Sequence, residues 1–293
     1  MGNTFFRQSD REEGVRHLMS INLLKRLESS VYSFRLTLQR IIEQINNMIN
    51  AITEYDTHTA LTLKDLSAMD LDFDDEAENE AFIIGKTVKF ELQDIDTKKW
   101  RIDLEEDRIL LQNLLEETNK ITPSHDLKLQ TLLDIIRDKI QNPINADNKK
   151  VLIFSAFSDT VDYLYEYVSV FAKKNFNLDT AMVTGSVDGK TTLKSIKGDL
   201  NTVLTCFSPI SKQRELMGEG VRGNIDILIA TDCISEGQNL QDCDYLINYD
   251  IHWNPVRIIQ RFGRIDRIGS QNNFIQLVNF WPDISLDEYI NLK

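Results

Sequence analysis

The sequence contains few of the residues that build metal sites, disulfide frameworks and membrane spans. Its 293 residues include only three cysteines and four histidines. Cys206, Cys233 and Cys243 have no CxxC spacing and the histidines are scattered, so no zinc-ligand pattern is present. We therefore expect no metal site, and reduced thiols as in a cytoplasmic protein. No apolar run approaches the roughly 20 residues that span a bilayer, which argues against a membrane partner.

Positive charge is also scarce. The 33 Lys and Arg residues stand against 46 Asp and Glu, which gives a net charge of −13. Proteins that hold nucleic acid through its phosphates need clustered Lys and Arg, although a local patch is enough. Residues 69–80 contain seven acids and no base, whereas residues 253–267 contain four arginines and one acid, Asp266. The second stretch keeps nucleic acid open as a partner.

A glycine-rich phosphate loop is missing as well. The pattern G-x-x-x-x-G-K-[ST] is not met by residues 185–191, which have only three residues between their glycines. Residues 155–158 (Ser-Ala-Phe-Ser) are not glycine-rich, which counts against a nucleotide- or sugar-binding α/β enzyme. The acidic residues 72–75 follow no apolar strand, so they are a poor Mg²⁺-holding motif. We expect a complete ATP site to need chain outside this sequence, with Met1 lying inside a longer protein.

Helical periodicity dominates the first half of the chain. Residues 10–52 predict one long helix, because apolar residues recur in steps of three and four from Leu24 onward without Pro or Gly. Further helices are predicted over 102–118 and 127–140, with an acidic surface loop near 55–85. The apolar stripe has two open interpretations. It is either a brace that packs against other domains, or part of a hairpin that closes on its own core with the helix near 104–118.

From Lys150 onward, short apolar runs alternate with amphipathic stretches. We predict a helix over 160–172 and strands over 151–154, 180–183, 225–230, 245–249 and 274–278. Strands separated by helices imply an α/β fold whose parallel sheet is covered on both faces. Ligands in such folds bind at loops beyond the carboxyl ends of the strands. We therefore divide the chain into a helical region, 1–149, and an α/β domain, 150–293.

The strongest chemical signal is the run Gln-Arg-Phe-Gly-Arg-Ile-Asp-Arg at 260–267. On a helix, Arg264 and Arg267 would face the same way, and Gly263 would allow close approach of another surface. A guanidinium fork suits the charge that builds on a γ-phosphoryl group during hydrolysis. For a lone pair of arginines, a surface helix with salt bridges would be the favoured interpretation.

Two further segments follow predicted strands. Residues 231–241 are small and polar, and can offer backbone N–H groups and short side chains to phosphate or ribose. Trp253 and Asn254, followed by Pro255, place an aromatic ring beside an amide, which suits the backbone and base faces of nucleic acid. Each segment is weak alone, since a Trp near a strand end usually serves packing.

In this order and spacing, the segments resemble the C-terminal RecA-like helicase lobe of superfamily 2, in its SNF2 family. The resemblance runs from about Val151 to Asn279. Residues 260–267 match the Q-x-x-G-R-x-x-R of motif VI, 231–241 look like motif V, and 151–155 resemble motif IV. Residues 260–269 look closer to the bacterial RapA-like branch than to chromatin remodellers. The fold implied is a RecA-like sheet flanked by helices, preceded by a mostly helical region.

The resemblance also implies a role for individual residues. The catalytic arginine fingers would be Arg264 and Arg267. The nucleotide cleft would be lined by Gln260, Glu236, Gly237 and Asn239. The nucleic-acid strand would be contacted by Thr184, Ser186, Thr231, Trp253 and Asn254.

Taken together, these roles imply an ATP-dependent DNA translocase or helicase acting on double-stranded DNA. ATP and Mg²⁺ would be held mainly by an N-terminal RecA-like lobe that this chain lacks, so the chain alone should be inactive. The alternative is a free-standing, non-catalytic module that binds nucleic acid or protein. The intact spacing of Gln260, Gly263, Arg264 and Arg267 speaks against it, because a non-catalytic domain has no need of that spacing.

Overall fold

The chain forms two compact units, residues 1–122 and 123–293. The computed structural model describes residues 8–57, 96–185, 189–217, 222–234, 238–251 and 254–281. Helix α5 (Leu127–Gln141) belongs to the second unit. The structural division therefore lies one helix earlier than the boundary at 149–150 expected from the sequence, and the acidic loop expected near 55–85 lies almost wholly outside the described residues.

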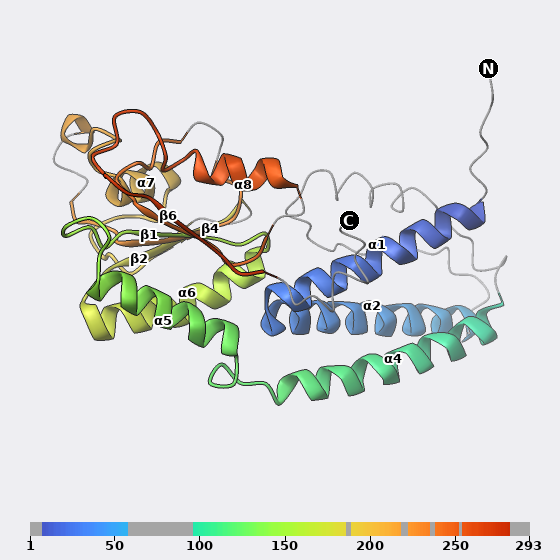
Figure 1. Ribbon diagram of the computed structural model, residues 1–293. Coiled ribbons are helices and arrows are strands. Elements are labelled where there is room, and N and C mark those ends of the chain that lie inside the picture. The colour runs from blue at the N-terminus through green and yellow to red at the C-terminus, as the bar shows by residue number, and fades with distance from the viewer. Residues whose placement is uncertain are drawn as a thin grey trace, which may run out of the picture. The chain divides into compact units, whose positions relative to one another are not determined.

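Helix α2 (Val31–Thr57) lies at the centre of the described part of the first unit. It packs along both α1 (Gln8–Ser29) and α4 (Thr97–Asn119), as Figure 1 shows. Isoleucines of α2 spaced three or four residues apart form a buried core with Leu104 of α4. These isoleucines are Ile41, Ile45, Ile49 and Ile52. The apolar stripe thus closes on the helices of its own unit, which confirms the second of its two interpretations.

The prediction of a single long helix over 10–52 is wrong, because the helix is interrupted at Ser30, between α1 and α2. The Ser30 hydroxyl accepts a hydrogen bond from the backbone N–H of Ser33 at 3.1 Å. A serine that satisfies a free N–H in this way starts a new helix. The heptad spacing of apolar residues does not reveal such an interruption, because two antiparallel helices that pack together need the same spacing as one continuous helix.

The second unit is built on a six-stranded sheet in the order β3-β2-β4-β1-β5-β6. The strands are β1 (Val151–Phe154), β2 (Thr180–Val183), β3 (Lys190–Thr191), β4 (Ile227–Ala230), β5 (Tyr245–Asn248) and β6 (Gln276–Asn279). All neighbouring strands run parallel except β3, a short antiparallel strand beside β2 that the sequence did not predict. The expected α/β fold with a mostly parallel sheet is confirmed, and the five predicted strands lie within two residues of their observed ends.

Helices cover both faces of the sheet (Figure 1). Helices α5 and α6 (Ser158–Phe176) lie on one face, and α7 (Leu200–Phe207) and α8 (Pro255–Phe262) lie on the other. Every residue of β1, β2, β4 and β5 is buried, as expected for strands covered on both sides. Leu152 and Phe154 alternate toward the face where α7 contributes Val203 and Phe207 to a shared core. This rigid sheet positions the loops at its two edges.

Candidate functional site

The loops after β2 and β4 lie side by side at the carboxyl edge of the sheet. The backbone N–H of Thr231 donates to the carbonyl of Val183 at 3.2 Å. A Cβ added at Gly185 would lie 3.3 Å from the Cβ of Cys233, so the two loops are in close contact. The structure therefore brings Thr184 and Thr231 to one edge, as the sequence predicted. Their side chains are only 5% and 2% exposed.

The hydroxyls of these two threonines differ in their partners. Thr231 accepts a hydrogen bond from the N–H of Cys233 at 3.4 Å. The buried hydroxyl of Thr184 has no hydrogen-bond partner among the described residues. Buried polar groups are normally satisfied, so each exception calls for an explanation. Ser186, assigned to the same strand of nucleic acid, lies outside the described residues.

Asp250 joins the carboxyl ends of β1 and β5. One carboxylate oxygen accepts from the Ser155 hydroxyl and the other from the N–H of Ala156, each at 2.6 Å. Asp250 is 5% exposed and Ser155 is fully buried. Hydrogen bonds to a carboxylate are roughly twice as strong as those between neutral groups. The first loop of the sheet is therefore fixed against the segment that leads into α8.

Arg261, in the last turn of α8, connects the segment 231–241 with the segment 260–267. Its Nε and Nη2 atoms donate to the two carboxylate oxygens of Asp232, each at 2.7 Å. Its Nη1 atom donates to the side chain of Asn248 at 3.0 Å and to the carbonyl of Asp250 at 3.3 Å. The guanidinium also lies 5.1 Å from the ring centre of Phe154. One fully buried side chain thus holds together the ends of β1, β4 and β5 and helix α8.

Sequence reasoning missed Arg261, Asp232 and Asp250. The two aspartates each follow a buried strand closely, and Arg261 lies next to a residue that was assigned a role. A charged residue directly after a buried strand is a usable signal, because a charge near the core needs a partner. The identity of that partner was not accessible, since Asp232 and Arg261 are 29 residues apart.

The expectation that Arg264 and Arg267 lie on a helix is wrong. Helix α8 ends at Phe262 with Gly263 as its C-cap. The N–H groups of Arg264 and Ile265 then bond three residues back, at 3.1 and 3.0 Å, and form a tight turn. The helix ends here because glycine is, after proline, the residue least favourable to a helix interior. Both arginines lie in the loop between α8 and β6.

The two arginines differ in exposure. Arg264 is 5% exposed. Its carbonyl accepts from the N–H of Leu240 at 3.0 Å. This bond connects the end of the 231–241 segment to the loop between α8 and β6, residues 263–275, which we call the arginine loop. Arg267 is half-buried, and its Nε atom donates to the carbonyl of Gly263 at 2.9 Å. Of the two, Arg267 is the more accessible to a ligand.

The remaining predicted residues have mixed outcomes. Gln260 and Asn239 are half-buried, and Asn239 accepts the N–H of Gln241 at 3.3 Å. Asn254 caps α8 by accepting the N–H of Val256 at 3.0 Å. The capping role was not predicted, and the assigned contact with nucleic acid stays a prediction. Glu236, Gly237 and Trp253 lie outside the described residues.

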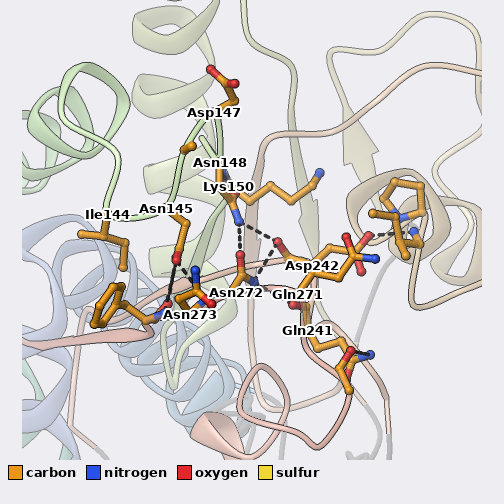
Figure 2. Close-up of a pocket in the computed structure, with 15 residues that line it drawn as sticks. Ile144, Asn145, Asp147, Asn148, Lys150, Gln241, Asp242, Gln271, Asn272 and Asn273 are labelled. Atoms are coloured by element: carbon orange, nitrogen blue, oxygen red, sulfur yellow. Dashed lines mark hydrogen bonds between the residues drawn. The ribbon is translucent and has the colours of Figure 1, made fainter.

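A polar groove of about 540 Å³ lies at the opposite, amino-terminal edge of the sheet. Figure 2 shows its wall of amide side chains. Asn145 accepts from the N–H groups of Asn273 and Phe274 at 3.0 and 3.2 Å, and Asn148 donates to the side chain of Asn272 at 2.9 Å. These bonds fasten the loop before β6 to the segment before β1. We interpret the groove wall as a structural connection between these two segments, which the sequence analysis did not predict.

A buried ion pair strengthens the same edge. Lys139 of α5 and Asp244, just before β5, are both fully buried, with 2.7 Å between nitrogen and oxygen. Asn145 donates to the other carboxylate oxygen of Asp244 at 2.8 Å. This network attaches α5 to the sheet and explains why the second unit begins before the boundary expected from the sequence.

Within the described part of the chain, no group of three or more His, Cys, Asp or Glu side chains is placed to hold a metal ion. The described helices likewise include none that is long and apolar enough to cross a bilayer. The candidate site consists of the polar loops after β2 and β4 and of the loop that contains Arg264 and Arg267, which the N–H of Leu240 joins through the carbonyl of Arg264.

Comparison with known proteins agrees with this geometry. The family profile of the helicase conserved C-terminal domain matches residues 127–269. An uncharacterized ATP-dependent helicase, YqhH of Bacillus subtilis, is 29% identical over 189 residues, which cover 61% of this chain and 29% of that protein. The putative ATP-dependent DNA helicase fml2 of Schizosaccharomyces pombe is 25% identical over 59% of this chain and 20% of its own length.

A relative described by its name as acting on RNA is similar at the same level. The probable ATP-dependent RNA helicase ddx51 of Dictyostelium discoideum is 31% identical over 51% of this chain and 23% of its own length. The chain thus spans less than a third of the length of these relatives. Over residues 127–269 the chain is therefore similar to the helicase conserved C-terminal domain, and these relatives are described by their names as ATP-dependent helicases.

Proposed function

We propose that the α/β unit is the C-terminal lobe of an SNF2-like, ATP-dependent motor that moves along double-stranded DNA. The main support is the Arg261 network, in which a fully buried guanidinium joins the 231–241 and 260–267 segments through Asp232. A motor lobe needs a rigid connection of this kind, because the binding and hydrolysis of nucleotide must change the affinity of the same domain for nucleic acid.

The arginine loop fits the phosphates of ATP. Arg267 is half-buried and its Nε atom is fixed by the carbonyl of Gly263, which orients the guanidinium. Bound ATP would supply the γ-phosphoryl group whose transfer to water drives the motor. Arg264 and Arg267 would hold the negative charge that develops on that group. Gln260, Glu236, Gly237 and Asn239 would line the nucleotide cleft, with Mg²⁺ and most ATP contacts on an N-terminal lobe.

The carboxyl edge of the sheet suits the nucleic-acid track. Thr184 and Thr231 end neighbouring strands there, and the hydroxyl of Thr184 lacks a hydrogen-bond partner among the described residues. A small opening of the loops would let that hydroxyl donate to a phosphate. Ser186, Trp253 and Asn254 would complete the contact. The SNF2 resemblance favours DNA, whereas relatives named for DNA and for RNA match at similar identity.

The test uses the complete gene product, with ATP turnover measured with and without double-stranded DNA or RNA. We expect stimulation by DNA, and we expect Arg264→Ala to lower turnover by about 10³–10⁵-fold, the range typical of arginine fingers. Arg257→Ala, which changes another half-buried arginine of α8, is the matched control. An Arg264→Ala protein that keeps most of its DNA-stimulated turnover would contradict the role. The 293-residue chain by itself should hydrolyse no ATP.

A further inference from the structure

The arginine loop is bonded to the rest of the α/β unit near both of its ends. Near its beginning, the carbonyl of Arg264 accepts from the N–H of Leu240 at 3.0 Å. Near its end, Asn145 accepts from the N–H groups of Asn273 and Phe274 at 3.0 and 3.2 Å, and it donates to the carbonyl of Phe274 at 2.8 Å. A side chain from the segment between α5 and β1 therefore holds the end of the loop.

Asn148, from the same segment, is connected to Arg267 by a series of hydrogen bonds. Its Nδ2 atom donates to the side-chain oxygen of Asn272 at 2.9 Å, as Figure 2 shows. The backbone N–H of Asn272 donates to the hydroxyl of Ser270 at 3.2 Å. The backbone N–H of Ser270 then donates to the carbonyl of Arg267 at 3.1 Å. The backbone position of Arg267 therefore depends on contacts that begin at the amino-terminal edge of the sheet.

The amide groups of both asparagines have a fixed orientation. The Nδ2 atom of Asn145 also donates to Asp244, the carboxylate that pairs with the buried Lys139. The Oδ1 atom of Asn148 accepts from the backbone N–H of Lys150 at 3.0 Å. A flipped amide would place an NH₂ group against N–H donors in either case. Asn145 and Asn148 therefore present their amides to the loop in one way only.

We infer that Asn145 and Asn148 are positioning residues, which fix the arginine loop from the amino-terminal edge of the sheet and so determine where Arg267 lies. Catalysis by a positioned charge is sensitive to such an anchor, because a displacement of about 1 Å can lower a rate on the order of 10²-fold. The expected effect on catalysis rests on the proposed function. Neither asparagine belongs to a segment to which the resemblance to helicases assigned a role.

The first arm of the test follows the side chain of Arg267 in the 293-residue chain by nuclear magnetic resonance of the arginine Nε–H groups. The Nε–H of Arg267 donates to the carbonyl of Gly263, which slows its exchange with water. The signal is assigned by its loss in Arg267→Lys. Asn148→Asp keeps the size of the side chain and removes both of its donated bonds, because a carboxylate only accepts. We expect the Arg267 signal to move by more than its line width.

Asn142→Asp is the matched control, because it makes the same change in the same segment. The side chain of Asn142 donates to Asp138 of α5 at 2.8 Å, so the Arg267 signal should stay in place. If Asn148→Asp does not fold, Asn148→Ala makes the same test without adding a charge. An Arg267 signal that stays fixed in a folded Asn148 variant would overturn the inference. A loss of stability alone would leave the signal of the folded protein where it was.

The second arm measures DNA-stimulated ATP turnover by the complete gene product, normalised to folded protein. Asn148→Asp should lower kcat about 10- to 100-fold and leave the KM for ATP unchanged, whereas Asn142→Asp should change neither. If Arg264→Ala abolishes turnover while Asn148→Asp has the original kcat, the motor stands and the positioning role fails. If Asn148→Asp moves the Arg267 signal but Arg264→Ala keeps its turnover, the anchoring of the loop stands and the proposed motor fails.

Discussion

Arg261 illustrates at the scale of one residue how buried charge specifies this fold. Its guanidinium is fully buried, and each of its nitrogens donates to Asp232, Asn248 or the carbonyl of Asp250. Removing one partner of a buried pair leaves an uncompensated charge, which typically costs about 3–5 kcal/mol. Asp232 keeps 24% of its side chain exposed, so water can reach it once the arginine is gone. The lower end of that range is therefore expected.

We predict that Arg261→Ala lowers the free energy of unfolding of the α/β unit by about 3 kcal/mol. Urea denaturation followed by circular dichroism measures the change. Arg257→Ala, in the same helix, should shift it by no more than about 0.5 kcal/mol. Replacing the pair together, as Arg261→Met with Asp232→Leu, should recover part of the loss, because two apolar side chains leave no buried charge unpaired. Equal stability of Arg261→Ala and Arg257→Ala would refute the structural role.

Cys243 makes a second residue-scale prediction. Burial raises the pKa of its thiol from the ordinary 9.0 to about 12, so the thiol stays protonated in the folded protein. We expect Cys243 and the buried Cys206 to resist a thiol-specific reagent at pH 8, while half-buried Cys233 reacts first. Between pH 9 and 12 the unfolded chain ionises at Cys243 and the folded chain does not. Stability from this group is thus present below pH 9 and lost as the pH rises toward 12.

The measurement is the rate of thiol labelling in native and denatured protein, with the labelled sites identified by mass spectrometry. Rapid labelling of Cys243 in the native state at pH 8 would show that the core around β5 opens more readily than its burial implies. A fall in the free energy of unfolding across pH 9–12 should be smaller in Cys243→Ala than in the unaltered chain.

At the scale of elements, helix α8 begins at a residue with two assigned roles. Asn254 caps the helix, and Pro255 occupies its first turn. Aspartate caps helices about as well as asparagine but carries a negative charge. We therefore predict that Asn254→Asp keeps the thermal stability of the chain and weakens DNA binding by the complete protein. Asn254→Ala should lower stability by about 1 kcal/mol. Unchanged DNA affinity in Asn254→Asp would remove Asn254 from the proposed nucleic-acid contact.

Strands and helix breaks differed in how far they could be predicted. The strands were found because runs such as Val151–Phe154 are wholly apolar and short. The break at Ser30 was missed because one serine cap leaves the apolar stripe intact. Arg264 and Arg267 were placed on a helix because motif spacing was read as helix spacing, whereas Gly263 ends α8 before either residue. Periodicity reports which face is apolar and says little about where a helix stops.

At the scale of the whole chain, the division between Thr122 and Pro123 is itself testable. The second unit contains its own sheet, its covering helices and a continuous core. A domain of this kind can fold alone. We predict that residues 123–293 show the far-ultraviolet circular dichroism of an α/β protein and unfold cooperatively on heating. A fragment that starts at residue 150 should be less stable, because it lacks α5 and with it the Lys139–Asp244 pair. Equal stability of the two fragments would support the boundary expected from the sequence.

The sequence could not predict which residues of the site pair with each other when they lie far apart in the chain. Thr184 and Thr231 were placed correctly at one edge, since parallel strands bring their carboxyl ends together. The partners of Arg261, and the asparagine connection at the opposite edge, depend on contacts between residues far apart in the chain. A single sequence contains no signal for such pairs, because any of its aspartates could serve a given arginine.

The pairing of Arg261 with Asp232 has a consequence for how this protein can diverge over generations. A change at either position alone lowers the stability of the fold, and natural selection would remove such a variant. Neither site can therefore change by itself. The accessible route is a compensated one, in which both positions change within a short interval. Across descendants of this chain, the two sites should therefore vary together or not at all.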